Sequence, residues 1–442
     1  MKELFKNKNF SLLFMGNLVS EMGNVIFGFV AGLYVQDLAE QSGGSLLGIK
    51  SGIILALFIA LGAIIRVVLT PFAGVLVDRW DKVKVIWLTD YLRGIMFVVV
   101  AYVFFVGVNN NAAMLILLGV SVISGIVSAF FGPAISSVTP EIVGLEKVQV
   151  AQGANSIIQS STMILGVILG AAAFGLFEFH IALLINGISF LLSGFSEMFI
   201  KALYKDQVFT DIKESVMDGF KVGLTYLKTK SGLLTIMIYS LFLNFAFSPL
   251  FSLGIPYLFR TELSRSEWDL AWVNIAFGIS MMVFGVLVGG LVIKSTKQFI
   301  RKNLFVLSLS FVITTLLIYL LSINVISYGV FYVLLIIVQV IMAGGMMATN
   351  IPLNTALLKI IDEEYRARVF GVISSISGGA VPIAIFLGGI LMSYTSVAFL
   401  AITCAALLLV PTFGFLTNHK VSRMLDDIDD QGVQVTEIMT EN

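Results

Sequence analysis

The stretch Gly74-Val75-Leu76-Val77-Asp78-Arg79-Trp80-Asp81-Lys82-Val83-Lys84 decides the fold, because it is a short charged break between two long apolar runs. Residues 55–69 before it and residues 85–106 after it are almost wholly apolar. A bilayer-spanning helix needs about 20 predominantly apolar residues, and the segments 46–76 and 84–107 are each long enough to supply them. The pattern therefore predicts two membrane helices joined by a tight charged turn.

The composition is that of a polytopic membrane protein. Of the 442 residues, 58% are hydrophobic and 12% are charged, whereas soluble chains are about 45–50% apolar and about 25% charged. The formal net charge is zero, which gives no reason to expect a nucleic acid as partner. One cysteine and two distant histidines predict neither a disulfide framework nor a metal cluster, and no phosphate-binding loop motif occurs. We therefore expect a protein that is not an enzyme, uses no cofactor and is not driven directly by ATP.

Apolar runs between polar breaks predict an all-α membrane protein with twelve transmembrane helices in two six-helix bundles. The spans lie near 10–35, 46–76, 84–107, 112–136, 148–176, 180–201, 233–258, 270–293, 302–322, 327–350, 366–394 and 396–417. We expect residues 1–200 to form the N-terminal bundle and residues 233–418 the C-terminal bundle. Residues 201–232 are predicted to be a cytoplasmic linker with an amphipathic helix, and residues 419–442 a disordered cytoplasmic tail.

Charge and repetition support this organisation. With the amino end inside, 22 of the 27 lysines and arginines fall in cytoplasmic segments, which predicts a multi-pass cell-membrane protein with both termini cytoplasmic. A shift of 218 residues lays residues 146–171 on residues 364–389, so that Gly153 meets Gly371. Two halves of like topology are expected of a transporter that is built from parallel repeats.

The charged turn resembles the signature loop of the major facilitator superfamily, which reads approximately G-x-L-a-D-r-x-G-r-k. The matching residues are Gly74, Leu76, Asp78, Arg79, Lys82 and Lys84, and Asp81 stands where the family usually has glycine. The resemblance implies a gate, in which Asp78 approaches the positive amino end of a helix in the second half. Gly74, Arg79 and Lys84 are assigned to the same gate. Membrane orientation alone would explain the bases but not the acid.

Glu21 lies near the middle of the first span, where a charge costs at least about 2.5–3.5 kcal/mol and needs a partner or a wet cavity. The first span lines the central cavity in the superfamily, so the resemblance places Glu21 on the substrate path. A carboxyl there can couple proton entry to substrate exit. A hydrogen bond that only packs helices and a contact to a cationic substrate are the alternatives. Arg66, in the second span, is a candidate counter-charge to Glu21, an anion ligand or part of a structural ion pair.

Asp90 and Arg93 are three residues apart in the third span and can meet on one helix face. We interpret them as a structural or gating pair that extends the network of Asp78. Glu178 and Glu197 fall near span ends, where a side chain reaches water at little cost, and we predict no role for them.

Uncharged polar and aromatic side chains on several spans are candidates for a substrate pocket, although ordinary packing is the alternative for each one alone. They are Asn17, Asn24, Phe27, Phe130, Asn155, Gln159, Asn244, Phe245, Gln339 and Met342. A large apolar pocket with few polar anchors suits several lipophilic substrates.

Further stretches resemble one branch of the superfamily, the bacterial macrolide-efflux type of drug exporter. They include Phe72–Arg79 followed by Asp81 and Lys82, Asp90, Phe131-Gly132-Pro133-Ala134 and Arg368-Val369-Phe370. The resemblance implies a secondary transporter in the lipid bilayer that exports small amphipathic drugs in exchange for protons by alternating access, and we expect a monomer. The alternatives are a dedicated exporter of a siderophore-like metabolite, a lysophospholipid flippase, and a non-transporting sensor that retains the fold.

Overall fold

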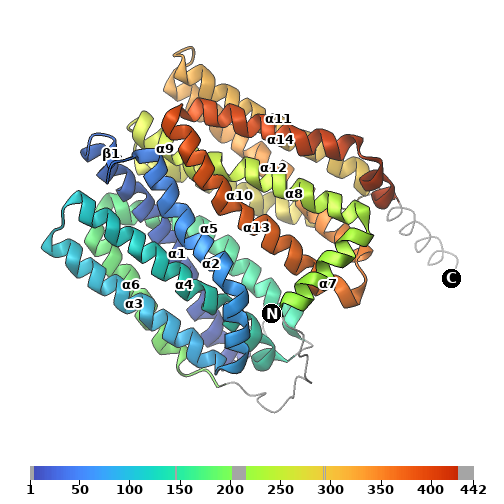
Figure 1. The fold of residues 1–442 in the computed structure, drawn as a ribbon, viewed down its shortest axis with the longest axis horizontal. Helices are drawn as coiled ribbons and strands as arrows, with labels where there is room; N and C mark the ends of the chain where they lie inside the picture. The colour runs from blue at the N-terminus through green and yellow to red at the C-terminus, as the bar shows by residue number, and fades with distance from the viewer. Residues whose placement is uncertain (1–3, 145–146, 202–215, 292, 294, 427–442) are drawn as a thin grey trace. The chain divides into compact units, whose positions relative to one another are not determined.

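The computed structural model describes residues 4–144, 147–201, 216–291, 293 and 295–426, and almost all of them are helical (Figure 1). The chain divides into two compact units. One comprises Met1–Val216 with Pro256–Ala271, and the other comprises Met217–Ile255 with Trp272–Asn442.

The first unit is built mainly from six long helices. They are α1 (Lys8–Gln41), α2 (Ser51–Arg79), α3 (Lys82–Val106), α4 (Asn110–Val143), α5 (Val148–Leu176) and α6 (Phe179–Glu197), with a short 3-10 turn, η1 (Leu4–Lys6), before α1. Two short antiparallel strands, β1 (Ser45–Leu46) and β2 (Ile49–Lys50), join α1 to α2. Leu47 and Gly48 between the strands have φ of 56° and 75°, as the tight turn of a two-residue hairpin requires.

The remaining helical segments follow residue 215 in the chain. They are α7 (Val216–Thr229), α8 (Ser231–Pro249), η3 (Leu250–Gly254), α9 (Ile255–Tyr257), η4 (Leu258–Glu262), α10 (Glu267–Gly289), α11 (Thr296–Ser322), α12 (Tyr328–Ile360), α13 (Glu363–Tyr394) and α14 (Val397–Thr417). The segments η3 and η4 are π-helical turns in one continuous helix that runs from α8 to Glu262. Pro249 and Pro256 each lack a backbone donor, which accounts for the widened turns.

Eleven of the described helices are long and apolar enough to cross a membrane, and α5 adds the apolar stretch Ile164–Leu176. The all-α membrane architecture that the sequence predicts is therefore confirmed. A membrane interior contains no water to satisfy backbone polar groups, so continuous helices are the expected spanning elements.

Helices α3 and α6 lie side by side in the first unit (Figure 1) and cross where both have glycine. A Cβ on Gly94 would lie 3.0 Å from the carbonyl oxygen of Gly187, and a Cβ on Gly187 would lie 3.1 Å from that of Gly94. Small residues let membrane helices approach closely, which is what van der Waals packing in lipid requires. The crossing fixes how far apart the polar residues of α3 and α6 stand.

The charged turn is shorter than the sequence pattern indicates. Helix α2 continues to Arg79 and α3 begins at Lys82, so only Trp80 and Asp81 lie between them. The side chain of Asp81 accepts a hydrogen bond from the backbone N–H of Lys84 at 3.2 Å, which caps α3. Helix α2 thus continues through Asp78 and Arg79, the first charged residues of the turn, and α3 begins at its cap, Asp81.

The linker contains an amphipathic helix, α7, whose apolar side is packed within the second unit. Leu227 is buried, and the Tyr226 ring stacks on Tyr365 with 4.7 Å between the ring centroids. The Tyr226 hydroxyl donates to Asp362 Oδ2 at 3.0 Å, and burial raises the pKa of this phenol. Residues 202–215 of the linker lie outside the described residues.

The predicted disordered tail, 419–442, differs from the structure in its first part. Residues 419–426 are helical, and Val421 and Leu425 are both buried. Their spacing of four places them on one helix face, and Lys297 Nζ pairs with Asp426 Oδ2 at 2.7 Å nearby. The rest of the tail lies outside the described residues.

Candidate functional site

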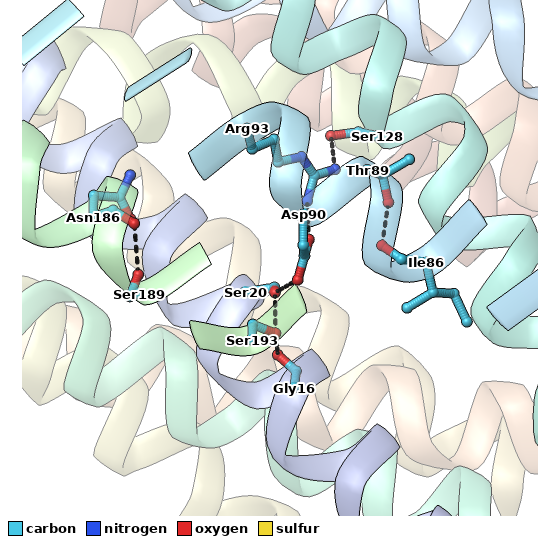
Figure 2. Close-up of polar contacts among 10 residues, drawn as sticks. All are labelled: Gly16, Ser20, Ile86, Thr89, Asp90, Arg93, Ser128, Asn186, Ser189 and Ser193. Carbon is cyan, nitrogen blue, oxygen red and sulfur yellow. Dashed lines mark hydrogen bonds and ion pairs between the residues drawn. The ribbon is translucent and has the colours of Figure 1, made fainter. Parts of the chain in front are cut away.

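A buried ion pair between Asp90 and Arg93 lies inside the first unit (Figure 2). Both residues are on α3, three positions apart, so the helix places them on one face. Arg93 NH1 lies 3.5 Å from Asp90 Oδ1, and the two side chains are 1% and 0% exposed. Burying such charges costs several kcal/mol per ion, by order of magnitude, unless good pairing offsets it. The two side chains do meet, and their role in gating stays a prediction.

Two serines connect Asp90 to the neighbouring helices (Figure 2). Ser20 on α1 donates a hydrogen bond to Asp90 Oδ2, and its hydroxyl oxygen lies 3.1 Å from that of Ser193 on α6. The Ser193 hydroxyl donates to the carbonyl oxygen of Gly16 at 3.0 Å. Helices α1, α3 and α6 are thus joined by one chain of polar contacts.

Arg93 is held by one hydrogen bond and two aromatic rings. Its NH2 group donates to the Ser128 hydroxyl on α4 at 3.0 Å. The guanidinium carbon lies 5.0 Å from the Phe131 ring centroid and 5.5 Å from that of Phe190, where the ring faces attract a cation. Within the described part of the chain, Nε and NH1 have no hydrogen-bond partner. The guanidinium therefore has unused donors.

Glu197, the last residue of α6, is a second buried carboxyl beside this pair. Its side chain is 0% exposed, and neither oxygen has a hydrogen-bond partner among the described residues. A Cβ on Gly16 would overlap its Oε1, so the missing side chain of that glycine makes the space for it. The prediction that Glu197 reaches water is wrong, because the end of α6 packs against α1.

Glu21 and Arg66 do not form the pair that the sequence allows. Glu21 is half-buried on α1, and it interacts electrostatically with both Asp90 and Arg93. Arg66 on α2 is exposed and interacts electrostatically with Arg93, and no ion pair between described residues joins it to Glu21. Their roles in proton coupling stay predictions.

The bases of the charged turn find acids close by. Lys82 Nζ lies 2.8 Å from Glu141 Oε1 on α4, a pairing that the sequence reading missed. Lys84 Nζ lies 3.9 Å from Asp81 Oδ2, and Arg79 is exposed. The turn is thus fastened to α4 by the lysine that begins α3.

Gly74 and Asp78, two residues of the predicted gate, lie within α2. Gly74 lies within α2, and a Cβ on it would meet nothing within 4 Å, so it does not mark a close helix approach here. Asp78 also belongs to α2, and its side chain lies outside the described residues. The gating role of both stays a prediction.

The candidate substrate residues of the first unit fall on α1, α4 and α5. Phe27 packs edge-on against Phe97 with 4.7 Å between the ring centroids, and Phe130 stacks on Trp80 at 6.0 Å. The others are Asn17, Asn24 and Asn155, which are half-buried, and Gln159, whose side chain lies outside the described residues. The two phenylalanines therefore have packing roles in this conformation.

The candidate substrate residues of the second unit fall on α8 and α12. Gln339 is buried, and neither atom of its amide has a hydrogen-bond partner among the described residues. Met342, one turn later, is also buried. Asn244 is exposed and donates to the Ser240 carbonyl at 2.9 Å, and Phe245 is half-buried. Gln339 is thus the polar group of this set that lacks a partner.

A pocket of ≈ 300 Å³ lies between α1, α5 and α6 in the first unit. Its lining is almost wholly apolar, with Asn186 and Ser189 as polar members. The Asn186 amide is buried and has no side-chain hydrogen bond in the part of the chain described. None of the sequence-predicted substrate residues lines this pocket, whose lining includes the small side chains of Ala172 and Ala173.

An ion-pair cluster near the carboxyl end of α1 was also missed. Arg260 donates to Asp37 from Nε and from NH2, each at 2.8 Å, and its NH1 lies 3.8 Å from Glu267 Oε2. Its guanidinium carbon lies 5.3 Å from the Phe174 ring centroid. Two-pronged arginine–carboxylate pairs are among the stronger hydrogen-bonded contacts. Sequence distance hides this cluster, since Asp37 and Arg260 follow the ends of two different predicted spans.

Membrane-spanning helices that bury ionisable groups in their interior are the architecture of a membrane transporter. The family model of the Major Facilitator Superfamily matches residues 13–385, and the chain belongs to this family. The predicted family and fold class are therefore confirmed, and the chain is a transporter.

Several known proteins are similar to this chain. The "Uncharacterized MFS-type transporter YkuC" of Bacillus subtilis (strain 168) is 27% identical over 84% of this chain and 82% of its own length. "Macrolide efflux protein A" of Streptococcus pyogenes is 23% identical over 89% of this chain and 95% of its own. The crystal structure of a bacterial homologue of the iron transporter ferroportin, in its inward-facing state, has a TM-score of 0.67 and 16% identity, covering 94% of this chain and all of that one. This last likeness concerns the fold alone.

Proposed function

We propose that this transporter exports amphipathic small molecules of the macrolide-like or multidrug kind in exchange for protons, by alternating access. It acts as a monomer in the cell membrane with both termini in the cytoplasm. Family membership establishes a multi-pass membrane transporter of small molecules. A relative named for macrolide efflux supports the direction of transport and the substrate class.

The observation that carries proton coupling is the buried Asp90–Arg93 pair with Glu21 beside it. Packing alone gives little reason for such a pair, because apolar residues of similar volume often replace buried ions without loss of stability. Glu21 is half-buried and acts electrostatically on both members of the pair, and within the described residues it has no hydrogen bond or ion pair that a change of its protonation would break. We assign the coupled proton to Glu21, with Arg66 as its counter-charge in another conformation.

The charged turn supplies the gate in this proposal. Gly74, Asp78, Arg79 and Lys84 make weak contacts in one state that are lost in the other. Contacts that differ between two states are what shifts their populations. Asp90 and Arg93 connect this gate to Glu21, since they stand on the helix that follows the turn.

Substrate binding is assigned to the polar and aromatic side chains of the two units. These are Asn17, Asn24, Phe27, Phe130, Asn155, Gln159, Asn244, Phe245, Gln339 and Met342. The buried amide of Gln339, which lacks a partner among the described residues, has the properties of a polar anchor in an apolar site.

The test is dye extrusion from vesicles that hold the wild type, Glu21→Gln, or Glu40→Gln as a control for an exposed glutamate on the same helix. Collapsing the pH gradient should stop extrusion by the wild type and by the control. The Glu21→Gln variant should no longer respond to the gradient. Unaltered transport by the wild type without a gradient would refute proton coupling. Movement of labelled lysophospholipid without dye extrusion would identify a lipid flippase instead.

A further inference from the structure

Glu197 has the surroundings of a proton-binding carboxyl. Its side chain is fully buried at the carboxyl end of α6, where the helix dipole presents partial negative charge. Gly16 of α1 lies against one of its oxygens, and neither oxygen has a hydrogen-bond partner among the residues described. The Ser193 hydroxyl, one turn earlier on α6, acts on this carboxyl, but it donates to the Gly16 carbonyl oxygen at 3.0 Å. An ionised carboxylate in this place would therefore lack the several hydrogen bonds that make buried charge tolerable.

The charges around Glu197 do not balance without a proton. Asp90 and Arg93 on α3 are the charged groups that act on it, while Glu21 on α1 and Arg66 on α2 act on that pair. Arg93 lies 3.5 Å from Asp90 and neutralises one carboxylate. One guanidinium cannot neutralise two carboxylates, so the buried cluster is neutral only when it holds one proton.

Arg93 has donors available for a second carboxylate. Its NH2 group is used by Ser128, whereas Nε and NH1 have no hydrogen-bond partner in the described part of the chain. A guanidinium offers five N–H donors in a fixed fork, which suits recognition of a carboxylate. Arg93 therefore has donors to offer a second carboxylate, and Glu197 interacts with it electrostatically, as Asp90 does.

We propose that Glu197 is a proton-binding residue of this transporter, protonated while Arg93 pairs with Asp90. On release, the O–H bond of Glu197 breaks, the proton passes to water, and the carboxylate accepts hydrogen bonds from the unused donors of Arg93. Uptake reverses these steps. As a site of the coupled proton, this assignment rests on the proposed proton-driven transport and adds a second carboxyl to Glu21.

The experiment compares the wild type with Glu197→Gln, whose amide resembles the protonated acid in shape and charge. Glu178→Gln is the matched control, since Glu178 precedes the same helix and its side chain is 81% exposed. Infrared spectra of the purified proteins in lipid at neutral pH report the carbonyl band of protonated carboxyls. We expect this band in the wild type and in the control, and its loss in Glu197→Gln. In proteoliposomes, only Glu197→Gln should lose the stimulation of dye transport by a pH gradient.

The outcomes separate this inference from the proposed function. An infrared band that is unchanged in Glu197→Gln overturns the protonated state of Glu197, whatever transport does. Loss of the band with retained gradient stimulation overturns its role in coupling, while proton-driven transport itself stands. A wild type that ignores the gradient refutes the proposed function and the coupling role together.

A second measurement on the wild type guards against a variant that does not fold. A hydrophobic carbodiimide modifies protonated carboxyls in apolar surroundings, and peptide mapping by mass spectrometry locates the modified residue. We expect Glu197 to be modified and the labelling to fall as the pH is raised. Absence of label on Glu197 at every pH would overturn the proposal.

Discussion

Removing Arg93 tests whether the ion pair on α3 is a true buried pair. The substitution Arg93→Gln leaves Asp90, which is 0% exposed, without the charge 3.5 Å away that offsets its burial. Breaking a buried pair from one side costs about 3–5 kcal/mol, because an uncompensated charge remains. Removing both charges with Asp90→Asn and Arg93→Gln costs less, since Ser20 can still hydrogen-bond to the amide. We expect the double variant to regain most of the lost free energy of unfolding.

The assay is unfolding of the detergent-solubilised protein by heat or by increasing denaturing detergent, for the two single variants and the double variant. Lys82→Gln is the control, because its ion pair with Glu141 is at 2.8 Å but only half-buried. A pair that solvent partly reaches contributes less than a fully buried one, and exposed pairs contribute about 0–1 kcal/mol. Two results would refute the interpretation of Asp90 and Arg93 as a compensated buried pair. The double variant could be as unstable as Arg93→Gln, or Arg93→Gln could lose no more free energy of unfolding than Lys82→Gln does.

Two further predictions concern helix packing. A Cβ on Gly94 would lie 3.0 Å from the Gly187 carbonyl oxygen. Overpacking of this kind lowers the free energy of unfolding by about 1–3 kcal/mol, so Gly94→Ala should lower the midpoint temperature of thermal unfolding. Gly119→Ala, where nothing lies within 4 Å, should leave the midpoint unchanged or raise it, and equal effects would argue against the close crossing. Tyr226→Phe removes the hydroxyl that donates to Asp362 at 3.0 Å, and should cost about 0.5–1.5 kcal/mol in the same assay. Burial raises the pKa of Tyr226, so this cost should be the same at pH 6 and pH 8.

The architecture was predictable because it follows from one-dimensional patterns. Apolar length sets the number of spans, and the match of the charged turn to a family motif sets the fold class. Spacing within one helix was equally informative, since Asp90 and Arg93 meet as their separation of three residues predicts. Boundaries were less predictable: the cap formed by Asp81 and the helical stretch at 419–426 depend on local hydrogen bonds and tertiary packing.

The surroundings of the site depend on contacts between helices, which spacing along the chain does not reveal. Its place at a span end predicts that Glu197 reaches water, yet Gly16 leaves space for its side chain inside the bundle. The pairing of Asp37 with Arg260 joins segments that are distant in the sequence. Gly16 and Gly23, seven residues apart on α1, both face α6, and this spacing is the one sequence signal that could have indicated where the two helices meet closely. Nothing in the sequence specifies which acid occupies the resulting space.

The second unit indicates that this helix arrangement does not need buried charge. Helix α11 begins at the cap Ser295 as α3 begins at the cap Asp81, and α14 is the last span of its half as α6 is of the first. Positions in the two halves can be matched by counting residues from the start of each helix. Asp90 and Arg93 then correspond to Leu304 and Leu307 on α11, and Glu197 corresponds to Phe415 on α14. All three residues of the second half are buried. Helices α11 and α14 pack together as α3 and α6 do. The α11–α14 contact includes a hydrogen bond between the hydroxyls of Ser308 and Thr412 at 2.7 Å, but these three positions carry no charge. Helix packing therefore does not by itself account for the two acids and the arginine of the first unit.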